Sequence, residues 1–243
     1  MTIAILLTLC SKNQTWRKLN ECDFLQIFLQ GFYESISFKH DFRFYIGFDD
    51  NDEFFVKHAK ELKQRIHKDD VIVALPSEKT NGNPCEAWNI LGRRAIKDKD
   101  IDYLFQVGTD IYQLTPNWDS YFVNIMKQHN NKGICGGVEK QFYLERVLRG
   151  QQGIIENGFI HRNHIEKLGT IFNKNLKTWF SDDYLTSLYQ DYCYLCPWVE
   201  FKNINRVGGS NELSRYNPDM SVQNSWEEWA DNDRRSLFDI EVS

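Results

Sequence analysis

A carboxylate follows an apolar segment that has the composition of a buried strand. Residues 102–107 are mostly apolar, and Gly108, Thr109 and Asp110 come directly after them. Glycine lets the backbone approach a ligand closely, and hard divalent cations such as Mg²⁺ and Mn²⁺ prefer oxygen ligands and bridge to phosphates. Asp110 is therefore suited to hold such a cation against a phosphorylated ligand. The alternative is that Asp110 caps the turn into the next element.

Two adjacent carboxylates, Asp182 and Asp183, stand beside the aromatic residues Trp179 and Phe180. A carboxylate of this kind can take the proton from an attacking hydroxyl group. Aromatic side chains exclude water from such a site and offer flat faces to sugar rings. The alternative is a helix N-cap, for which the Ser-Asp-Asp sequence is well suited, and the two roles can coexist.

Further polar residues follow other apolar segments. Asp49 and Asp50 come after residues 42–48, and Ser11 comes shortly after the apolar run that contains Thr8 and Leu9. Carboxylates accept hydrogen bonds from ring N–H groups and ribose hydroxyls. The alternative for the two aspartates is a solvated acidic loop that caps the following helix.

The histidines and cysteines indicate no metal centre. His161 and His164 are three residues apart, which places them on one helical face, but no third ligand with suitable spacing is evident. Hydrogen bonding to a substrate or a structural role is favoured over zinc binding. Cys193 and Cys196 form the only CxxC pair among six cysteines, and a structural zinc site would need a second pair or nearby histidines. Free thiols in a reducing compartment are expected instead.

These residues need elements to position them, and the first half of the chain alternates strands with helices. Such alternation predicts an α/β fold with a Rossmann-like, mostly parallel central sheet flanked by helices. Ligands of these sheets bind beyond the carboxyl ends of the strands, which is where the polar residues above are expected to converge. The predicted strands are Thr2–Leu9, 42–48, Val71–Leu75 and 102–107, and the predicted helices are 16–36, 55–66 and 84–96.

The second half is less regular. We expect a helix over 116–129, a short strand over 133–138, and further structured segments over 158–164 and 179–189. Glycines 208 and 209 predict a mobile loop, and Arg206 and Arg215 lie close to it in the sequence. Trp226 and Trp229 are expected to pack a terminal helix onto the core, with sugar stacking as the alternative. No repeat or linker interrupts the chain, so we expect one domain over residues 1–243.

Composition excludes some classes of function. The 243 residues carry 29 basic and 34 acidic side chains, a net charge of −5, which argues against a nucleic-acid-binding protein. The apolar N-terminal run is shorter than the roughly 20 residues that span a bilayer and lacks a signal-peptide pattern. We therefore expect no transmembrane segment and a cytoplasmic location.

Taken together, the motifs over about residues 2–190 resemble those of GT-A glycosyltransferases. Residues 108–110 align with the DxD motif of that family, with glycine in place of its first aspartate, so only Asp110 carries over as the metal and diphosphate ligand. The resemblance implies that Thr8, Leu9 and Ser11 surround the nucleotide, that Asp49 or Asp50 binds its base, and that Arg93 and Thr109 lie near the diphosphate.

The later motifs extend the resemblance to the acceptor side. Residues 182–183 resemble the acidic motif of inverting enzymes, whose second carboxylate is usually the base, which implies Asp183 as base and Asp182 as a supporting or alternate base. His161, His164 and Trp179 would then contact the acceptor. Many family members supply a late histidine to the metal, and none follows His164 here.

The resemblance implies a glycosyltransferase that moves a sugar from a UDP- or GDP-linked donor to a glycan or other hydroxyl acceptor, with Mn²⁺ or Mg²⁺ and inversion. Residues 1–115 would bind the nucleotide sugar and residues 116–243 the acceptor. One alternative is a catalytically inert carbohydrate-binding or scaffold protein of GT-A shape. Another is a sugar-nucleotide nucleotidyltransferase, against which the glycine-free segment 10–14 argues.

Overall fold

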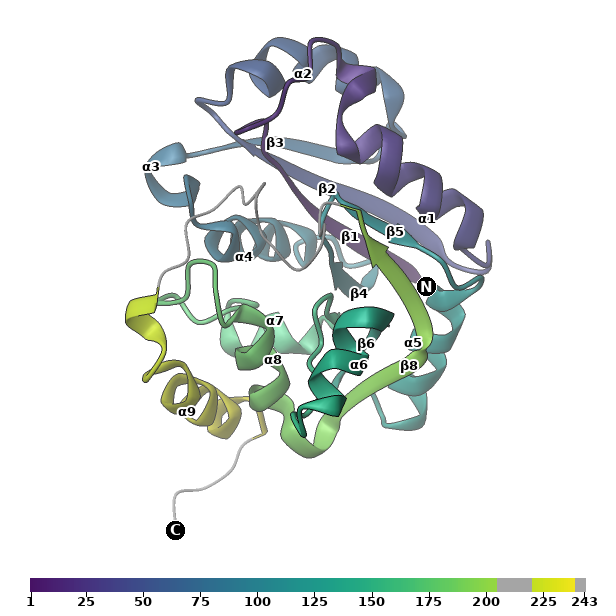
Figure 1. Cartoon of the computed structure of the whole chain (residues 1–243). Coiled ribbons are helices and arrows are strands. Elements are labelled where there is room, and N and C mark those ends of the chain that lie inside the picture. The colour runs from purple at the N-terminus through teal and green to yellow at the C-terminus, as the bar shows by residue number, and fades with distance from the viewer. Residues whose placement is uncertain (205–219, 239–243) are drawn as a thin grey trace.

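The computed structural model describes residues 1–204 and 220–238. Within these residues, eight strands form one mixed sheet in the order β3-β2-β1-β4-β7-β6-β8-β5, with helices on both faces (Figure 1). The strands are β1 (Thr2–Leu9), β2 (Asp41–Asp49), β3 (Val71–Leu75), β4 (Ile101–Gln106), β5 (Ile111–Gln113), β6 (Ile134–Glu139), β7 (Phe159–His161) and β8 (Cys193–Asn203). The helices are α1 (Leu29–Ser35), α2 (Glu53–Arg65), α3 (Ser77–Thr80), α4 (Pro84–Ala95), α5 (Trp118–Gln128), α6 (Lys140–Leu148), α7 (Asn163–Leu168), α8 (Ser181–Tyr189) and α9 (Trp226–Phe238).

Strands β3, β2, β1 and β4 are parallel and form the predicted Rossmann-like half of the sheet. Their apolar runs are typical of strands that are covered on both faces. In β1, for example, Ile3 and Ile5 belong to the core on one face, and Ala4 and Leu6 belong to the core on the other. Alternation along each strand therefore builds two cores from one continuous apolar segment.

The other half of the sheet is mixed. Strand β7 runs antiparallel to β4 and β6, β8 runs parallel to β6, and β5 closes the edge antiparallel to β8. Strands β5 and β7 are three residues long, too short for a periodic pattern to predict them.

Two groups of helices cover the two faces. The core on one face is built with side chains of α1, α2 and α5, and the core on the other face with side chains of α4, α7, α8 and α9. Figure 1 shows α1 and α2 together above the parallel strands, with α4 on the other side of them. The expected packing of Trp226 and Trp229 against the core is present in α9.

Some elements differ from the sequence-based expectations. The predicted helix over 16–36 is divided into a 3-10 turn (Leu19–Glu21), a π-helical turn (Phe24–Phe28) and α1. Helix α6 and the long strand β8 were not predicted. Cys193 and Cys196 lie on β8 and pack against opposite cores, both as free thiols, so the CxxC spacing brings no pair together.

The glycine loop at 208–209, with Arg206 and Arg215, lies outside the described residues. None of the helices within the described ranges is long and apolar enough to cross a membrane.

Candidate active site

The carboxyl ends of the parallel strands meet at one edge of the sheet. Leu9 of β1 pairs with Phe48 of β2, and Asp49 of β2 pairs with Leu75 of β3. On the other side of β1, the Val107 N–H donates to the Leu6 carbonyl at 3.3 Å, directly after β4. The register therefore brings the segments after β1, β2 and β4, which carry the predicted donor-site residues, to the same edge.

A cavity of about 250 Å³ opens where the segment after β4 approaches the start of α8. Three acidic side chains line it, Asp110, Glu156 and Asp182, together with the indoles of Trp88 and Trp179. Trp179 is 42% exposed, so its ring is accessible. The remaining lining residues are Pro84, Gln106, Gly108, Ile111, Asn157, Thr178, Ser181 and Asn203.

Gly108 makes room for the Asp110 carboxylate. A Cβ atom at position 108 would lie only 2.7 Å from Asp110 Oδ1, so the carboxylate occupies the space that a side chain at 108 would need. The backbone of Asp110 is also fixed, because the Ile204 N–H donates to its carbonyl at 2.9 Å. A side chain at position 108 would therefore require the Asp110 carboxylate to turn away from its present position.

Two buried amides support the segment that carries Asp110. The Gly108 N–H donates to Asn157 Oδ1 at 3.4 Å, and the Gly158 N–H donates to Gln106 Oε1 at 3.3 Å. Gln106 and Asn157 are each 4% exposed and both line the cavity. These bonds tie the end of β4 to the segment before β7 and stabilise one wall of the site.

The start of α8 has a strained residue next to the acidic pair. Phe180 precedes the helix with φ of 66°, a left-handed conformation that is unusual for a bulky side chain and concentrates at functional sites. Its carbonyl accepts the first helical bond, from the Tyr184 N–H at 2.8 Å. Asp182 and Asp183 thus lie in the first turn of the helix, where the unpaired N–H groups favour negative charge.

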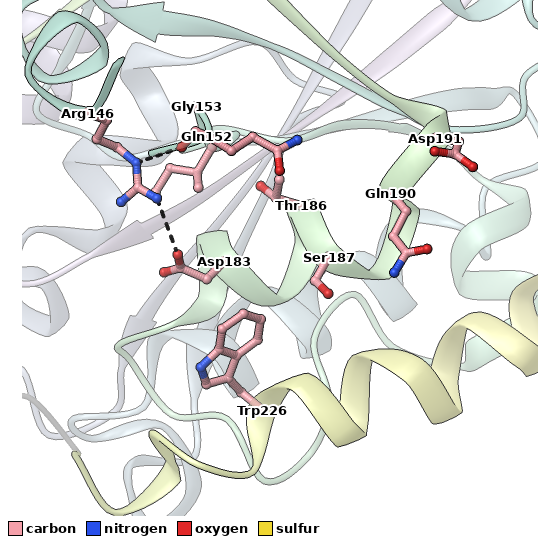
Figure 2. Close-up of a pocket in the computed structure, with 10 residues that line it drawn as sticks. Arg146, Gln152, Gly153, Asp183, Thr186, Ser187, Gln190, Asp191 and Trp226 are labelled. Carbon is pink, nitrogen blue, oxygen red and sulfur yellow. Dashed lines mark hydrogen bonds and ion pairs between the residues drawn. The ribbon is translucent and has the colours of Figure 1, made fainter. Parts of the chain in front are cut away.

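The two aspartates face different cavities. Successive residues of a helix are about 100° apart around its axis, and here Asp182 lines the cavity of Asp110 whereas Asp183 lines a second cavity. Figure 2 shows Asp183 directed at Arg146 of α6, and the ion pair between them measures 3.9 Å. Burial raises the pKa of the Asp183 carboxyl above its usual value.

Two polar atoms at the first cavity are buried and lack hydrogen bonds within the described residues, namely Trp88 Nε1 and Thr178 Oγ1. Both residues line the cavity. The Cys85 N–H of α4 donates to the Lys177 carbonyl at 3.2 Å, which holds the Thr178 segment against the start of α4. Buried polar groups are nearly always hydrogen-bonded in native proteins, so both atoms keep unused hydrogen-bonding capacity next to this cavity.

The predicted nucleotide-binding residues lie at the carboxyl edge. Thr8 and Leu9 are buried at the end of β1, and Leu9 packs in the core. The Ser11 N–H and hydroxyl both donate to Asp52, at 2.8 and 2.7 Å. Asp52 also caps α2 by accepting from the Phe55 N–H at 3.1 Å, so it anchors the loop after β1 to that helix.

Asp49 and Asp50 have contrasting environments. Asp49 accepts from the Thr80 hydroxyl at 2.6 Å, and burial raises the pKa of its carboxyl. Asp50 is exposed and accepts from the Ser77 N–H at 3.1 Å, and its hydrogen bonds with Ser77 lower its pKa. Asp49 is therefore the half-buried carboxylate at this edge, and Asp50 anchors α3.

The Asp110 cavity is lined by none of the predicted nucleotide-binding residues at or after the ends of β1 and β2, nor by four other predicted site residues, namely Arg93, Thr109, His161 and His164. Arg93 lies in the last turn of α4, about 13 Å along the helix from Pro84, and its guanidinium donates to Glu86 at 2.9 Å. His161 lies on β7 opposite Tyr103, near the start of β4. Burial lowers the pKa of His161.

His164 is a core residue. It is 2% exposed, with Nδ1 2.5 Å from the Tyr189 hydroxyl and Nε2 3.1 Å from the Ile171 carbonyl. A carbonyl only accepts, so Nε2 carries the proton and Nδ1 accepts from Tyr189. Burial lowers the pKa of His164 to about 4, and the neutral ring satisfies both partners.

The arrangement around Asp110 suits a cation that is carried by a diphosphate. No group of three His, Cys, Asp or Glu side chains able to hold a metal occurs in residues 1–204 and 220–238. Asp110 nevertheless offers an oxygen ligand at a cavity, and Mg²⁺ or Mn²⁺ commonly completes its shell with phosphate oxygens and water. The residues described thus fit a substrate-bound cation, held through one protein carboxylate.

Several residues that line the Asp110 cavity belong to no motif in the sequence. Glu156, Asn157 and Asn203 belong to irregular segments or to the end of β8, where no motif marks them. Gln106 is the last residue of β4, and its place in a mostly apolar run gives no sign that it borders a cavity. Only the strand pairing of the mixed half of the sheet brings these side chains to Asp110.

Comparisons with known proteins bear mainly on the fold. No protein-family model matches the chain. An uncharacterised chromosomal cassette SCCmec type IVc protein of Staphylococcus aureus, CR006, is 30% identical over 120 residues, which cover 45% of this chain and 15% of that protein. The match thus spans a small part of a much longer relative.

Solved structures match more of the chain. The S. aureus TarS fragment 1–349 has a TM-score of 0.57 at 11% identity, and the match covers 100% of this chain and 76% of TarS 1–349. The same fragment in complex with UDP has a TM-score of 0.54 at 10% identity, covering 83% and 59%.

A third solved structure also matches most of the chain. It is the mannosyltransferase PcManGT from Pyrobaculum calidifontis in complex with GDP-Man and Mn²⁺, which has a TM-score of 0.54 at 15% identity and covers 85% of this chain and 58% of its own. At such low identity these likenesses establish the fold, and the expected GT-A fold is confirmed.

Proposed function

We propose that the chain is a glycosyltransferase that transfers a sugar from a nucleoside-diphosphate sugar to a hydroxyl group of a glycan or other acceptor. The observation that carries this proposal is that Asp110 and Asp182 line one cavity with Trp179. Function does not follow from fold alone, and this cavity joins an oxygen ligand, a candidate base and an aromatic face at the carboxyl end of β4.

The donor is proposed to be UDP- or GDP-linked. The support is that TarS was solved with UDP and PcManGT with GDP-Man. In this chain the nucleotide would lie at the carboxyl edge of β1 and β2, near Thr8, the Leu9 backbone and Asp49. Ser11 would shape this loop through Asp52, which already binds its N–H and hydroxyl. In the same proposal, residues 1–115 bind the donor and residues 116–243 the acceptor.

Asp110 is proposed as the carboxylate next to the diphosphate, with the buried Thr109 shaping the turn beside it. Mn²⁺ or Mg²⁺ bound with the donor would offset negative charge on the departing diphosphate. Arg93 is left out of this set because it does not line the Asp110 cavity and its guanidinium pairs with Glu86, a residue of the first turn of α4.

Asp182 is the better-placed base for an inverting transfer. It shares the cavity with Asp110, whereas Asp183 lines the second cavity and pairs with Arg146. A base must reach the acceptor hydroxyl as that hydroxyl attacks the anomeric carbon, which favours the carboxylate in the cavity of the diphosphate ligand. Trp179 would contact the acceptor, and His161 and His164 would contribute to packing.

The alternative is a catalytically inert carbohydrate-binding protein with the GT-A fold. Gly108, in place of the first carboxylate of the DxD motif, favours it. The Asp110 carboxylate lies beside Gly108, and an active site that uses one aspartate also accommodates this glycine. A cytoplasmic location belongs to the proposal, since the six cysteines carry free thiols, as expected in a reducing compartment.

Calorimetric titration of the chain with UDP and with GDP, each with and without Mn²⁺, tests donor binding. We expect saturable binding of at least one nucleotide, strengthened by Mn²⁺. An absence of binding to both nucleotides under either condition would remove the proposal. Activity is then measured as nucleoside diphosphate released from UDP- and GDP-sugars, which an inert protein would not produce.

A further inference from the structure

A second cavity lies between α6, α8 and the start of α9. Its volume is about 480 Å³, and it is lined by residues of these helices and of the segment that follows α6. Figure 2 shows Arg146 and Asp183 directed toward each other, with the indole of Trp226 beneath α8. None of these three residues lines the Asp110 cavity, so the two cavities are distinct.

The Arg146 side chain is held in place from several sides. Its Nε donates to the Gln152 carbonyl at 2.9 Å, and its guanidinium lies 5.7 Å from the centre of the Phe142 ring. Its contact with Asp183 is looser, at 3.9 Å, which leaves both groups able to hydrogen-bond a ligand hydroxyl. A donor fixed in this way loses little conformational entropy when a ligand binds.

The charges of the lining disfavour an anionic ligand. Asp183 and Asp191 carry two carboxylates against the one guanidinium of Arg146, so an anion would meet net repulsion. The indole of Trp226, which packs parallel to Phe180 at 6.2 Å, adds a flat aromatic surface of the kind that sugars contact. A polyhydroxylated, uncharged molecule matches this combination of donors, acceptors and an aromatic ring.

The backbone at the end of α8 resembles that at its beginning. Gln190, which lines the second cavity, has φ of 41°, and Phe180 before the helix is also left-handed. Such conformations are strained for residues other than glycine and concentrate at functional sites. The helix that separates the cavities is therefore bounded by a strained residue at each end.

The two cavities share a wall. Gln152, Gly153 and Ile154 line the second cavity, while Glu156 and Asn157 line the first. On α8, Asp182 lines the first cavity and Asp183 lines the second. The two segments are joined where the Ile155 N–H donates to Thr186 Oγ1 at 3.0 Å. A ligand that extends around the first turn of α8 would therefore reach from one cavity to the other.

We propose that this second cavity binds an uncharged sugar unit of the acceptor through Arg146, Asp183 and Trp226, next to the unit that reacts. The assignment of this unit to an acceptor rests on the proposed function. The binding of a neutral sugar by the cavity does not.

Methyl glycosides of glucose, mannose, galactose and N-acetylglucosamine serve as neutral probes, and glycerol 3-phosphate serves as the anionic comparison. The readout is the indole N–H signal of Trp226 in the NMR spectrum of the full chain, assigned with Trp226→Phe. We expect at least one glycoside to shift this signal saturably, and glycerol 3-phosphate to leave it unchanged.

Matched variants identify the cavity. Arg146→Met is expected to weaken glycoside binding at least tenfold, whereas Arg149→Met, which removes an exposed arginine of the same segment, changes it less than twofold. Failure of every glycoside to shift the Trp226 signal overturns the inference, as does equal weakening by the two arginine variants or a preference for glycerol 3-phosphate. Thermal unfolding of both variants identifies any loss of folding.

Nucleotide titration of the same sample separates the two proposals. Binding of UDP or GDP without glycoside binding overturns the second site and leaves the proposed function standing. Glycoside binding without nucleotide binding supports the sugar site and overturns its assignment to an acceptor.

Discussion

Asp110, in the loop after β4, and Asp182, in the first turn of α8, line one cavity. They reach it from opposite halves of the sheet, since β4 belongs to the parallel half and α8 leads into β8 of the mixed half. Under the proposed function, one carboxylate would bind a diphosphate-linked cation and the other would accept a proton within the same cavity. The predictions below depend on this relationship or on the groups that surround it.

Asp110→Asn is expected to weaken Mn²⁺-dependent binding of UDP or GDP about tenfold or more. The amide removes the negative charge that a hard cation prefers, while its size is unchanged. Calorimetric titration with and without Mn²⁺ measures the effect. Binding without the metal should change little, and an equal loss under both conditions would show that Asp110 acts on the fold or on the nucleotide directly.

Thr178→Val is expected to have opposite effects on stability and on ligand binding. Valine has nearly the shape of threonine and removes a buried hydroxyl that lacks a partner within the described residues, so the free energy of unfolding should rise by about 1 kcal/mol. Affinity for the nucleotide sugar should fall by a factor of about 3 to 10, the value of one hydrogen bond. Urea unfolding and calorimetry measure the two quantities.

Thr178→Ser is the matched control, since it keeps the hydroxyl and removes a methyl group. It should bind the nucleotide sugar better than Thr178→Val does. If valine binds as well as threonine, the hydroxyl has no role in the ligand site.

His164→Gln is expected to reduce the loss of stability on acidification. Burial lowers the pKa of His164 to about 4 from an ordinary value of 6.5, so the unfolded chain binds a proton that the folded chain excludes. The folded state therefore loses stability as pH falls from about 6.5 toward 4, by about 2 kcal/mol between pH 7 and pH 5. Urea unfolding at the two pH values should show a smaller difference in the variant, and an unchanged difference would contradict the assignment.

Much of the parallel half of the fold could be predicted from the sequence. The apolar segments 2–9 and 71–75 coincide with β1 and β3. For β1 the reason is that a strand buried on both faces needs a continuous apolar run, whereas β3 lies at the edge of the sheet and is mostly half-buried. Helix α4 begins at Pro84, as the Asn-Pro sequence indicated. The mixed half was predicted less completely, since β5 and β7 obtain their pairing from distant neighbours and carry no periodicity of their own.

The candidate site was also predicted only in part from the sequence. Asp110 was identified because a carboxylate at the end of an apolar strand is a local pattern. The choice between Asp182 and Asp183 is set by the rotation of α8 around its axis, which depends on how Tyr184 and Leu185 pack in the core. The motif itself does not show which way each of the two aspartates points. The structure shows that Asp182 and Asp183 line different cavities.

The most direct test of the central claim compares Asp182→Asn with Asp183→Asn, because the two variants remove the same charge from neighbouring positions. The measurement is release of UDP or GDP from a panel of nucleotide sugars, with unfolding midpoints to confirm that both variants fold. We predict that Asp182→Asn lowers the rate by about 100- to 10,000-fold, as removal of a general base does, and that Asp183→Asn lowers it tenfold or less. Full activity in Asp182→Asn, or a greater loss in Asp183→Asn than in Asp182→Asn, would contradict the account.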